Sequence, residues 1–193
     1  KSYPDLVQGV DEAAASIDSH LRLPANNPRT RALAGQWRRE SGDGEAVVRR
    51  MLDHIRQERF FYTLTPPLLG ENSIDQFLFE TRRGFCEHFA SAFVFAMRAA
   101  GVPARVVTGY QGGERNPVDG YLIVRQSDAH AWAEVWLEGR GWLRIDPTAA
   151  VAPNRIEAGL ASAVPVGEPL PFIGRADLSW LRQMRFRWEA VTN

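Results

Sequence analysis

Residues 84–110, GFCEHFASAFVFAMRAAGVPARVVTGY, contain the change of pattern that decides the fold. From Phe89 to Met97 the chain is apolar at nearly every position, which is typical of a helix buried on all sides. Gly101 is placed to end this helix, and Pro103 prevents it from continuing. Beyond Pro103 apolar and polar residues alternate with a period of two, as they do in a β-strand. The stretch therefore predicts a central buried helix followed at once by a sheet.

Upstream of this stretch the sequence predicts helices joined by short loops. The first helix ends near Leu23, because apolar residues recur at helical spacing up to that point. Asn27 followed by Pro28 predicts the N-cap and the first position of the second helix. Ser73 is placed to cap a short fourth helix. The predicted segments are, in order, helices at 6–23, 28–41 and 44–58, a short aromatic strand at 60–64 and a helix at 73–79.

Downstream of the central helix the sequence predicts antiparallel strands separated by Gly, Pro, Asn and Asp. Helices first and strands afterwards indicate an α+β fold with segregated layers, not a βαβ repeat. We expect one domain over residues 1–193. It consists of a helical N-terminal part (1–58), a core (about 60–150) and a tail (151–193) that wraps the domain and ends in an amphipathic helix. The predicted strands are 104–110, 121–125, 131–137 and 142–145.

Composition narrows the possible partners and location. The 193 residues contain 23 Lys plus Arg and 23 Asp plus Glu, so the formal net charge is zero. This balance gives no electrostatic reason to expect nucleic acid or an anionic membrane surface as a partner. No apolar stretch approaches the roughly 20 residues that span a bilayer, and no signal-peptide pattern opens the chain. Because the chain begins with Lys1, we expect it to be a piece of a longer or processed polypeptide.

Cys86 is the only cysteine. It cannot form an intramolecular disulfide, and structural zinc sites built on thiolates usually need two to four of them. The residue stands at the start of the central helix, where unpaired backbone N–H groups and the helix dipole favour a negative charge. A thiol in this position is suited to act as a nucleophile. The alternative is that Cys86 is a small apolar residue of the core.

His130 and Asp146 are the residues that can turn this thiol into a nucleophile. They flank a predicted hairpin whose turn contains Gly139 and Gly141, so the imidazole can meet a carboxylate that orients it. With a regular two-residue turn, however, the two side chains would project from opposite faces of the sheet. The sequence therefore predicts an odd-length loop or a bulge at the two glycines.

The remaining candidates near Cys86 are weaker. His88 lies about 200° around the helix from the thiol and is expected to point away from it, as a solvent-facing or structurally bonded histidine. The spacing of Cys86, His88, His130 and Glu134 matches no zinc pattern, so we predict no metal site. Trp132 is compatible with the wall of a substrate cleft and with a place in the core.

Four segments together resemble the successive motifs of the transglutaminase-like superfamily. The match extends over about residues 60–150, whereas the flanks 1–40 and 150–193 carry no comparable motif. The resemblance implies a papain-like α+β fold with Cys86 as nucleophile, His130 as general base and then acid, and Asp146 as the orienting carboxylate. The segments are RGFCEHFA (83–90), AGVPARVVTGY (100–110), HAWAEV (130–135) and GWLRIDPT (141–148).

The resemblance is greatest to bacterial multi-pass membrane proteins that carry such a domain outside the cytoplasmic membrane. It implies a periplasmic or other extracytoplasmic location, a membrane-anchored parent and a protein or peptide substrate, with cell-wall peptides among the candidates. The resemblance implies that the second donor to the oxyanion is a Trp or Tyr side chain upstream of the nucleophile, and Tyr62 is the nearest such residue. We predict no cofactor, because no acidic loop of the kind that calcium favours is present.

Three functions are compatible with these residues. The first is a thiol acyltransferase of transglutaminase type, which forms a Cys86 thioester and passes the acyl group to an amine. The second is a cysteine peptidase or amidase, in which water takes the acyl group from the same Cys86, His130 and Asp146. The third is a catalytically silent module whose cleft binds a peptide or a cell-wall strand.

Overall fold

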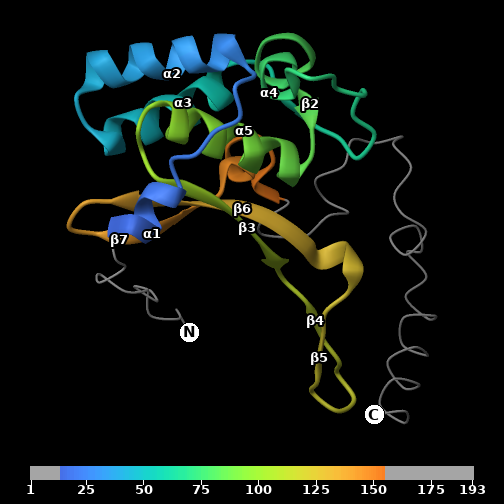
Figure 1. Ribbon diagram of the computed structural model, residues 1–193. Coiled ribbons are helices and arrows are strands. Elements are labelled where there is room, and N and C mark those ends of the chain that lie inside the picture. Colours follow the sequence, from blue (N-terminus) through green and yellow to red (C-terminus); the bar gives the residue numbers. More distant parts are fainter. Residues whose placement is uncertain (1–13, 155–193) are drawn as a thin grey trace.

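The structure, a computed structural model, describes residues 14–154 and has most of its helices packed on one side of an antiparallel sheet, whereas the short first helix lies apart from them beside the last strand (Figure 1). This arrangement confirms the predicted α+β class. The helices and helical turns are α1 (Ala14–Ser19), α2 (Pro28–Ser41), α3 (Gly44–Gln57), α4 (Ser73–Gln76), the π-helical turn η1 (Phe77–Thr81), α5 (Cys86–Ala99) and the 3₁₀ turns η2 (Gln126–Asp128) and η3 (Pro147–Ala150). The strands are β1 (Phe61–Tyr62), β2 (Arg83–Gly84), β3 (Ala104–Tyr110), β4 (Glu114–Arg115), β5 (Leu122–Ile123), β6 (Ala129–Leu137) and β7 (Gly141–Ile145).

Helix α5 is the centre of the domain, as its continuous apolar sequence predicts. It contacts α2 and α3 as well as strands β3 and β6. Phe89, Phe93 and Met97 are fully buried in the main core. The helix ends before Gly101, whose φ of 74° lies in the left-handed region that glycine adopts without a steric penalty. Its N–H donates to the carbonyl of Arg98, so the last turn closes on itself as expected.

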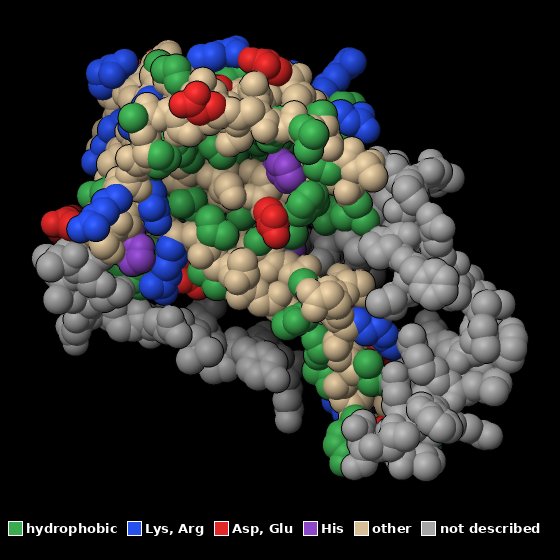
Figure 2. Space-filling view, turned by 45° about the vertical axis from the view of Figure 1, so that its right-hand side comes forward, with side chains coloured by type: hydrophobic (Ala, Val, Ile, Leu, Met, Phe, Trp, Pro, Cys, Tyr) green, Lys and Arg blue, Asp and Glu red, His purple; other side chains and the backbone are tan. Residues whose placement is uncertain are grey.

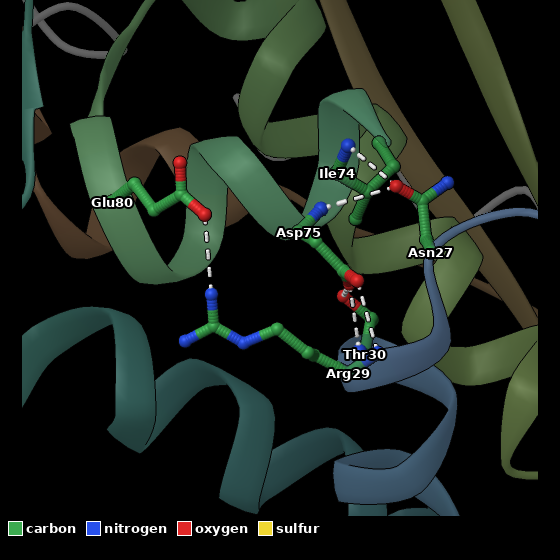
Figure 3. Close-up of polar contacts among 6 residues, drawn as sticks. All are labelled: Asn27, Arg29, Thr30, Ile74, Asp75 and Glu80. Atoms are coloured by element: carbon green, nitrogen blue, oxygen red, sulfur yellow. Dashed lines mark hydrogen bonds and ion pairs between the residues drawn. The ribbon is translucent and has the colours of Figure 1, made fainter. Parts of the chain in front are cut away.

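The starts of α2 and α4 cap each other (Figure 3). Asn27 precedes α2 as predicted, but its side chain does not cap that helix. Its Oδ1 instead accepts hydrogen bonds from the backbone N–H groups of Ile74 and Asp75 in α4 at 3.0 and 3.1 Å. The buried carboxylate of Asp75 in turn accepts from the N–H groups of Arg29 and Thr30 at 2.9 and 2.8 Å and from the Thr30 hydroxyl at 2.6 Å. These hydrogen bonds satisfy two backbone N–H groups at the start of each helix and hold the two helix starts together.

The main sheet has the strand order β3-β6-β7, and both pairings are antiparallel. Ala133 and Val135 of β6 are buried in the main core on the side of α5. A second pairing, β1 with β2, is parallel and was not anticipated. It lies directly before α5 and helps to fix where that helix begins.

A thin hairpin of β4 and β5 projects from the body of the domain (Figure 1). The strand expected at 121–125 is observed as β5 and is only two residues long. It pairs with β4 and not with the main sheet. Hydrophobic side chains cover much of this hairpin in the space-filling view (Figure 2), and Tyr121 and Leu122 are 63% and 61% exposed.

Some predicted segments fall outside the described residues. The part of the first helix before Ala14 and the tail from residue 155 onwards, including the amphipathic C-terminal helix, are not described. The helix expected at 73–79 begins at Ser73 and continues as the π-helical turn to Thr81. No helix between residues 14 and 154 is long and apolar enough to cross a bilayer.

Candidate active site

Cys86 is the first residue of α5 and is buried, with 8% of its surface exposed. It forms a small apolar cluster with Ala90 and Ala131, against which Phe85 packs. Ala131 follows His130 at the start of β6. The N-terminal end of the central helix therefore meets the end of the sheet at which the predicted histidine lies.

Gly84 allows the backbone to approach this helix end closely. A Cβ atom at position 84 would lie 2.7 Å from Cβ and Cγ of His88 and 3.0 Å from the ring of Phe77. No side chain fits at such distances, so only glycine lets strand β2 run against the first turn of α5. The close approach fixes the backbone two residues before Cys86 and thereby the position of the thiol.

The hairpin between β6 and β7 has the odd-length loop that the sequence predicts. Leu137 pairs with Gly141, which leaves the three residues 138–140 in the loop. Gly139 and Gly141 have φ values of 74° and 72°, in the left-handed region that such loops require. Because the register pairs even-numbered residues with even-numbered residues, His130 and Asp146 lie on the same face.

His130 and Asp146 are in direct contact. Nε2 of His130 lies 2.7 Å from Oδ2 of Asp146, and the histidine side chain is completely buried. The other carboxylate oxygen, Oδ1, accepts a hydrogen bond from the backbone N–H of Thr148 at 3.2 Å. Since Nε2 is engaged with Asp146, Nδ1 is the nitrogen available to the thiol. Within residues 14–154, Nδ1 is buried and has no hydrogen-bond partner at normal geometry.

The pKa of His130 is raised above its ordinary value. Burial acts to lower it, because the charged imidazolium loses hydration, but the hydrogen bond to Asp146 and then the neighbouring Cys86 thiol outweigh this effect. A raised pKa favours the protonated ring. The site therefore stabilises a positive charge beside the sulfur of Cys86.

Trp132, Gly109 and Arg144 form a wall beside the histidine. The Trp132 indole stacks on the His130 ring at 6.2 Å between centroids and 25° between planes. Gly109 of β3 pairs with His130 of β6, and a Cβ at position 109 would lie 3.0 Å from the indole of Trp132. The Arg144 guanidinium lies 4.3 Å from the indole centroid, and its Nη2 donates to Gln111 at 2.9 Å.

Sequence reasoning missed Gly109 and Arg144. The alternation of β3 and β7 was the available signal, because it places Gly109 opposite His130 and Arg144 on the face of Asp146. Arg144 Nη2 is 3.7 Å from Oδ2 of Asp146, the same oxygen that contacts the His130 imidazole.

Tyr62 lies one strand away from the helix start. It pairs with Gly84 in the parallel β1–β2 ladder and is 5% exposed within the main core. Its register therefore brings it beside the backbone two residues before Cys86.

His88 belongs to the packing around the helix start. Its Nδ1 accepts a hydrogen bond from the backbone N–H of Phe85 at 3.5 Å, and its ring lies against those of Phe77 and Phe85. Burial lowers the pKa of His88, although Glu87 acts in the opposite direction. Across the described part of the chain, no three His, Cys, Asp or Glu side chains gather in a way that could hold a metal ion.

Comparison with known proteins connects this geometry to a family. A family model of the transglutaminase-like superfamily matches residues 31–147. The chain is 48% identical over 179 residues to a protein-glutamine gamma-glutamyltransferase of Pseudomonas aeruginosa, covering 89% of this chain and 27% of that protein. It is 36% identical over 139 residues to the protein YebA of Bacillus subtilis, covering 68% of this chain and 19% of that protein.

A solved structure shares the fold. The crystal structure of the periplasmic domain of TgpA from Pseudomonas aeruginosa aligns with a TM-score of 0.77 and 51% sequence identity, over 79% of this chain and 54% of that one. The chain thus spans about a quarter or less of the curated relatives described above and about half of the solved domain. These matches confirm the resemblance inferred from the four motifs: the chain belongs to the transglutaminase-like superfamily.

Proposed function

We propose that this domain is a thiol acyltransferase of transglutaminase type. In this proposal Cys86 is the nucleophile, His130 is the general base and acid, and Asp146 orients the histidine and stabilises its protonated form. The observation that carries the proposal is the 2.7 Å contact between buried His130 and Asp146 beside the only cysteine, at the N-terminal end of α5. This is the arrangement that activates a thiol for attack on a carbonyl.

The first half of the reaction acylates the thiol. The Cys86 thiolate attacks the carbonyl carbon of a substrate carboxamide, and the C=O π electrons move onto oxygen to give a tetrahedral oxyanion. When this intermediate collapses, the C–N bond breaks, the imidazolium of His130 protonates the departing nitrogen, and ammonia leaves. A thioester on Cys86 and a neutral His130 remain. The second half reverses the roles, as His130 takes a proton from an attacking amine and returns it to the departing sulfur.

The oxyanion needs preorganised donors. The backbone N–H of Cys86 is one candidate, because the first N–H groups of a helix have no partner within it. Tyr62 is our candidate for the second, since its strand pairs with β2 immediately before the nucleophile. Loss of one such donor typically slows the reaction about 10²–10³-fold. Tyr62→Phe therefore tests the role directly, because it removes the hydroxyl and keeps the ring.

Two observations favour transfer to an amine over hydrolysis. The Pseudomonas relative is named for glutamyl transfer. In addition, Lys1 is the only lysine among the 193 residues of this chain, so the domain offers almost no acceptor amine of its own to the thioester. The alternative functions are a peptidase or amidase on the same residues and a silent binding module.

The location is proposed from the relatives. Because the Pseudomonas structure is that of a periplasmic domain, we propose that this domain also lies outside the cytoplasmic membrane, as part of a membrane-anchored parent. Its substrates would then be proteins or peptides of that compartment, including peptides of the cell wall. Fusion of the parent to a reporter that is active only outside the cytoplasm tests this location.

The function is tested by incubating the domain with a blocked glutaminyl-glycine peptide, with and without a primary amine. We expect ammonia release, a Cys86 thioester detectable by mass spectrometry, and an amide product when the amine is present. Release of free glutamate at the same rate with and without the amine would identify a hydrolase. Cys86→Ala should abolish both products. If the biological role survives this substitution, the binding module is the correct function.

A further inference from the structure

A pocket lies beside the first two turns of α5, on the side that the triad does not use. Its volume is about 210 Å³, smaller than the roughly 300–1,000 Å³ of sites that take whole small-molecule ligands. This size suits a single side chain of a larger substrate. Three apolar residues form part of its lining: Leu69, Ile74 and Phe77.

The rest of the lining is polar. Glu87 supplies a carboxylate, Ser73 and Ser91 supply hydroxyls, and His88 supplies its ring. Glu87 is exposed and, among the described residues, forms no ion pair with an arginine. Burial lowers the pKa of His88, so the histidine adds no competing positive charge near neutral pH. The pocket thus has an apolar wall and one negative charge.

The pocket lies close to the thiol along the chain. Glu87 and His88 directly follow Cys86, and Ser91 lies five residues after Cys86, about 7.5 Å along the helix axis. By helical spacing these residues lie roughly 100–200° around α5 from Cys86. A substrate held at the thiol reaches the pocket by crossing the N-terminal end of the helix, whose diameter is about 10 Å. An extended peptide covers that distance in about three residues.

We propose that this pocket is a specificity subsite for a basic side chain on an aliphatic stem, such as that of lysine, two or three residues from the reacting residue of a polypeptide acyl donor. The stem packs on Leu69, Ile74 and Phe77, and the ammonium lies at Glu87 with the serine hydroxyls as further acceptors. The inference rests on the proposed function, because it assumes that an acyl donor reacts at Cys86.

Affinity labels test the subsite without requiring turnover. The probes are blocked tetrapeptides ending in a chloromethyl ketone, in which the Cys86 thiolate displaces chloride to form a thioether. Each probe carries lysine or norleucine, which has a similar stem without the charge, at the position two or three residues before the ketone. Because Glu87 is exposed, we expect lysine to be preferred at one of these positions by about fivefold in the second-order labelling rate, the upper range for an exposed ion pair.

Variants assign the preference to the pocket. In Glu87→Gln the ratio of lysine to norleucine labelling should fall to about one, and a ratio is insensitive to any change in thiol reactivity. The matched control is Glu138→Gln, which removes an exposed carboxylate elsewhere and should keep the native ratio. Ser91→Met, which fills the pocket, should slow labelling by both peptides at the preferred position.

Three results would overturn the inference. Equal labelling by the lysine and norleucine probes at both positions would exclude charge recognition. A lysine preference that persists in Glu87→Gln would assign it to another site. If none of the probes reacts with Cys86 in the folded domain, the proposed function fails, and the subsite fails with it.

Discussion

Replacing Asp146 by Asn should slow acyl transfer by a factor that follows from the burial of His130. The substitution keeps the shape of the side chain and removes its charge. In the native site the histidine side chain is fully buried and its Nε2 is 2.7 Å from the carboxylate. Removing one partner of a buried charged pair typically costs about 3–5 kcal/mol. At about 1.36 kcal/mol per tenfold, the acylation rate should fall about 10²–10⁴-fold.

The assay is acylation by the glutaminyl-glycine peptide with hydroxylamine as acceptor, read as hydroxamate. A second readout is the titration of the His130 ring by NMR. In the native site the bond to Asp146 helps to outweigh the burial that lowers the pKa of His130, so the pKa should fall in Asp146→Asn. Asn keeps Oδ1 as acceptor for the Thr148 N–H, and thermal unfolding serves as the control for the fold. A variant that retains the native rate within about threefold would refute the assigned role of Asp146.

Three further predictions concern the scaffold. Asp75→Ala removes three hydrogen bonds at the start of α2 and should lower the free energy of unfolding, measured with urea, by about 2–4 kcal/mol. A loss below about 0.5 kcal/mol would contradict the capping of α2 by Asp75. Gly84→Ala places a Cβ 2.7 Å from His88, so it should lower the free energy of unfolding by about 1–3 kcal/mol and slow the labelling of Cys86. The matched control is Gly35→Ala, inside α2, where the new Cβ would meet only the end of a flexible arginine side chain. This control should stabilise the protein by about 0.5–1 kcal/mol. Burial lowers the pKa of His54, although Glu58 opposes this effect, so the stability that depends on neutral His54 is present above the ordinary histidine pKa of about 6.5 and is lost as the pH falls. His54→Gln should make the free energy of unfolding, measured with urea between pH 7.5 and 5, fall less steeply with decreasing pH. Parallel pH curves for the native and variant proteins would disprove this prediction.

The parts of this fold that the sequence predicts are those governed by local patterns. The apolar run after Cys86 specifies a buried helix wherever the rest of the chain lies. The requirement that His130 and Asp146 share a face could be turned into a prediction about loop length, because strand side chains alternate strictly. Gly139 and Gly141 supply the positive φ angles that this odd-length loop uses.

The parts that could not be predicted depend on contacts between distant segments. Asn27 and Asp75 are 48 residues apart, and nothing local distinguishes an Asn that caps its own helix from one that caps another. The parallel pairing of β1 and β2 involves two residues in each strand, too few to show a period. Gly84 looks like a loop glycine until the approach of His88 is known. The contact between Arg144 and Trp132 also joins two strands, and it depends on the register in which β6 pairs with β7.

The pH dependence of Cys86 alkylation by iodoacetamide, in the native domain and in His130→Ala, tests the central claim most directly. It requires no substrate, and Cys86 is the only thiol. If His130 and Asp146 activate the sulfur, the native rate stays high well below pH 8.5, near which a free thiol ionises, and this low-pH reactivity disappears in His130→Ala. A native thiol that reacts only after unfolding, or equally well in both proteins at low pH, would contradict the account.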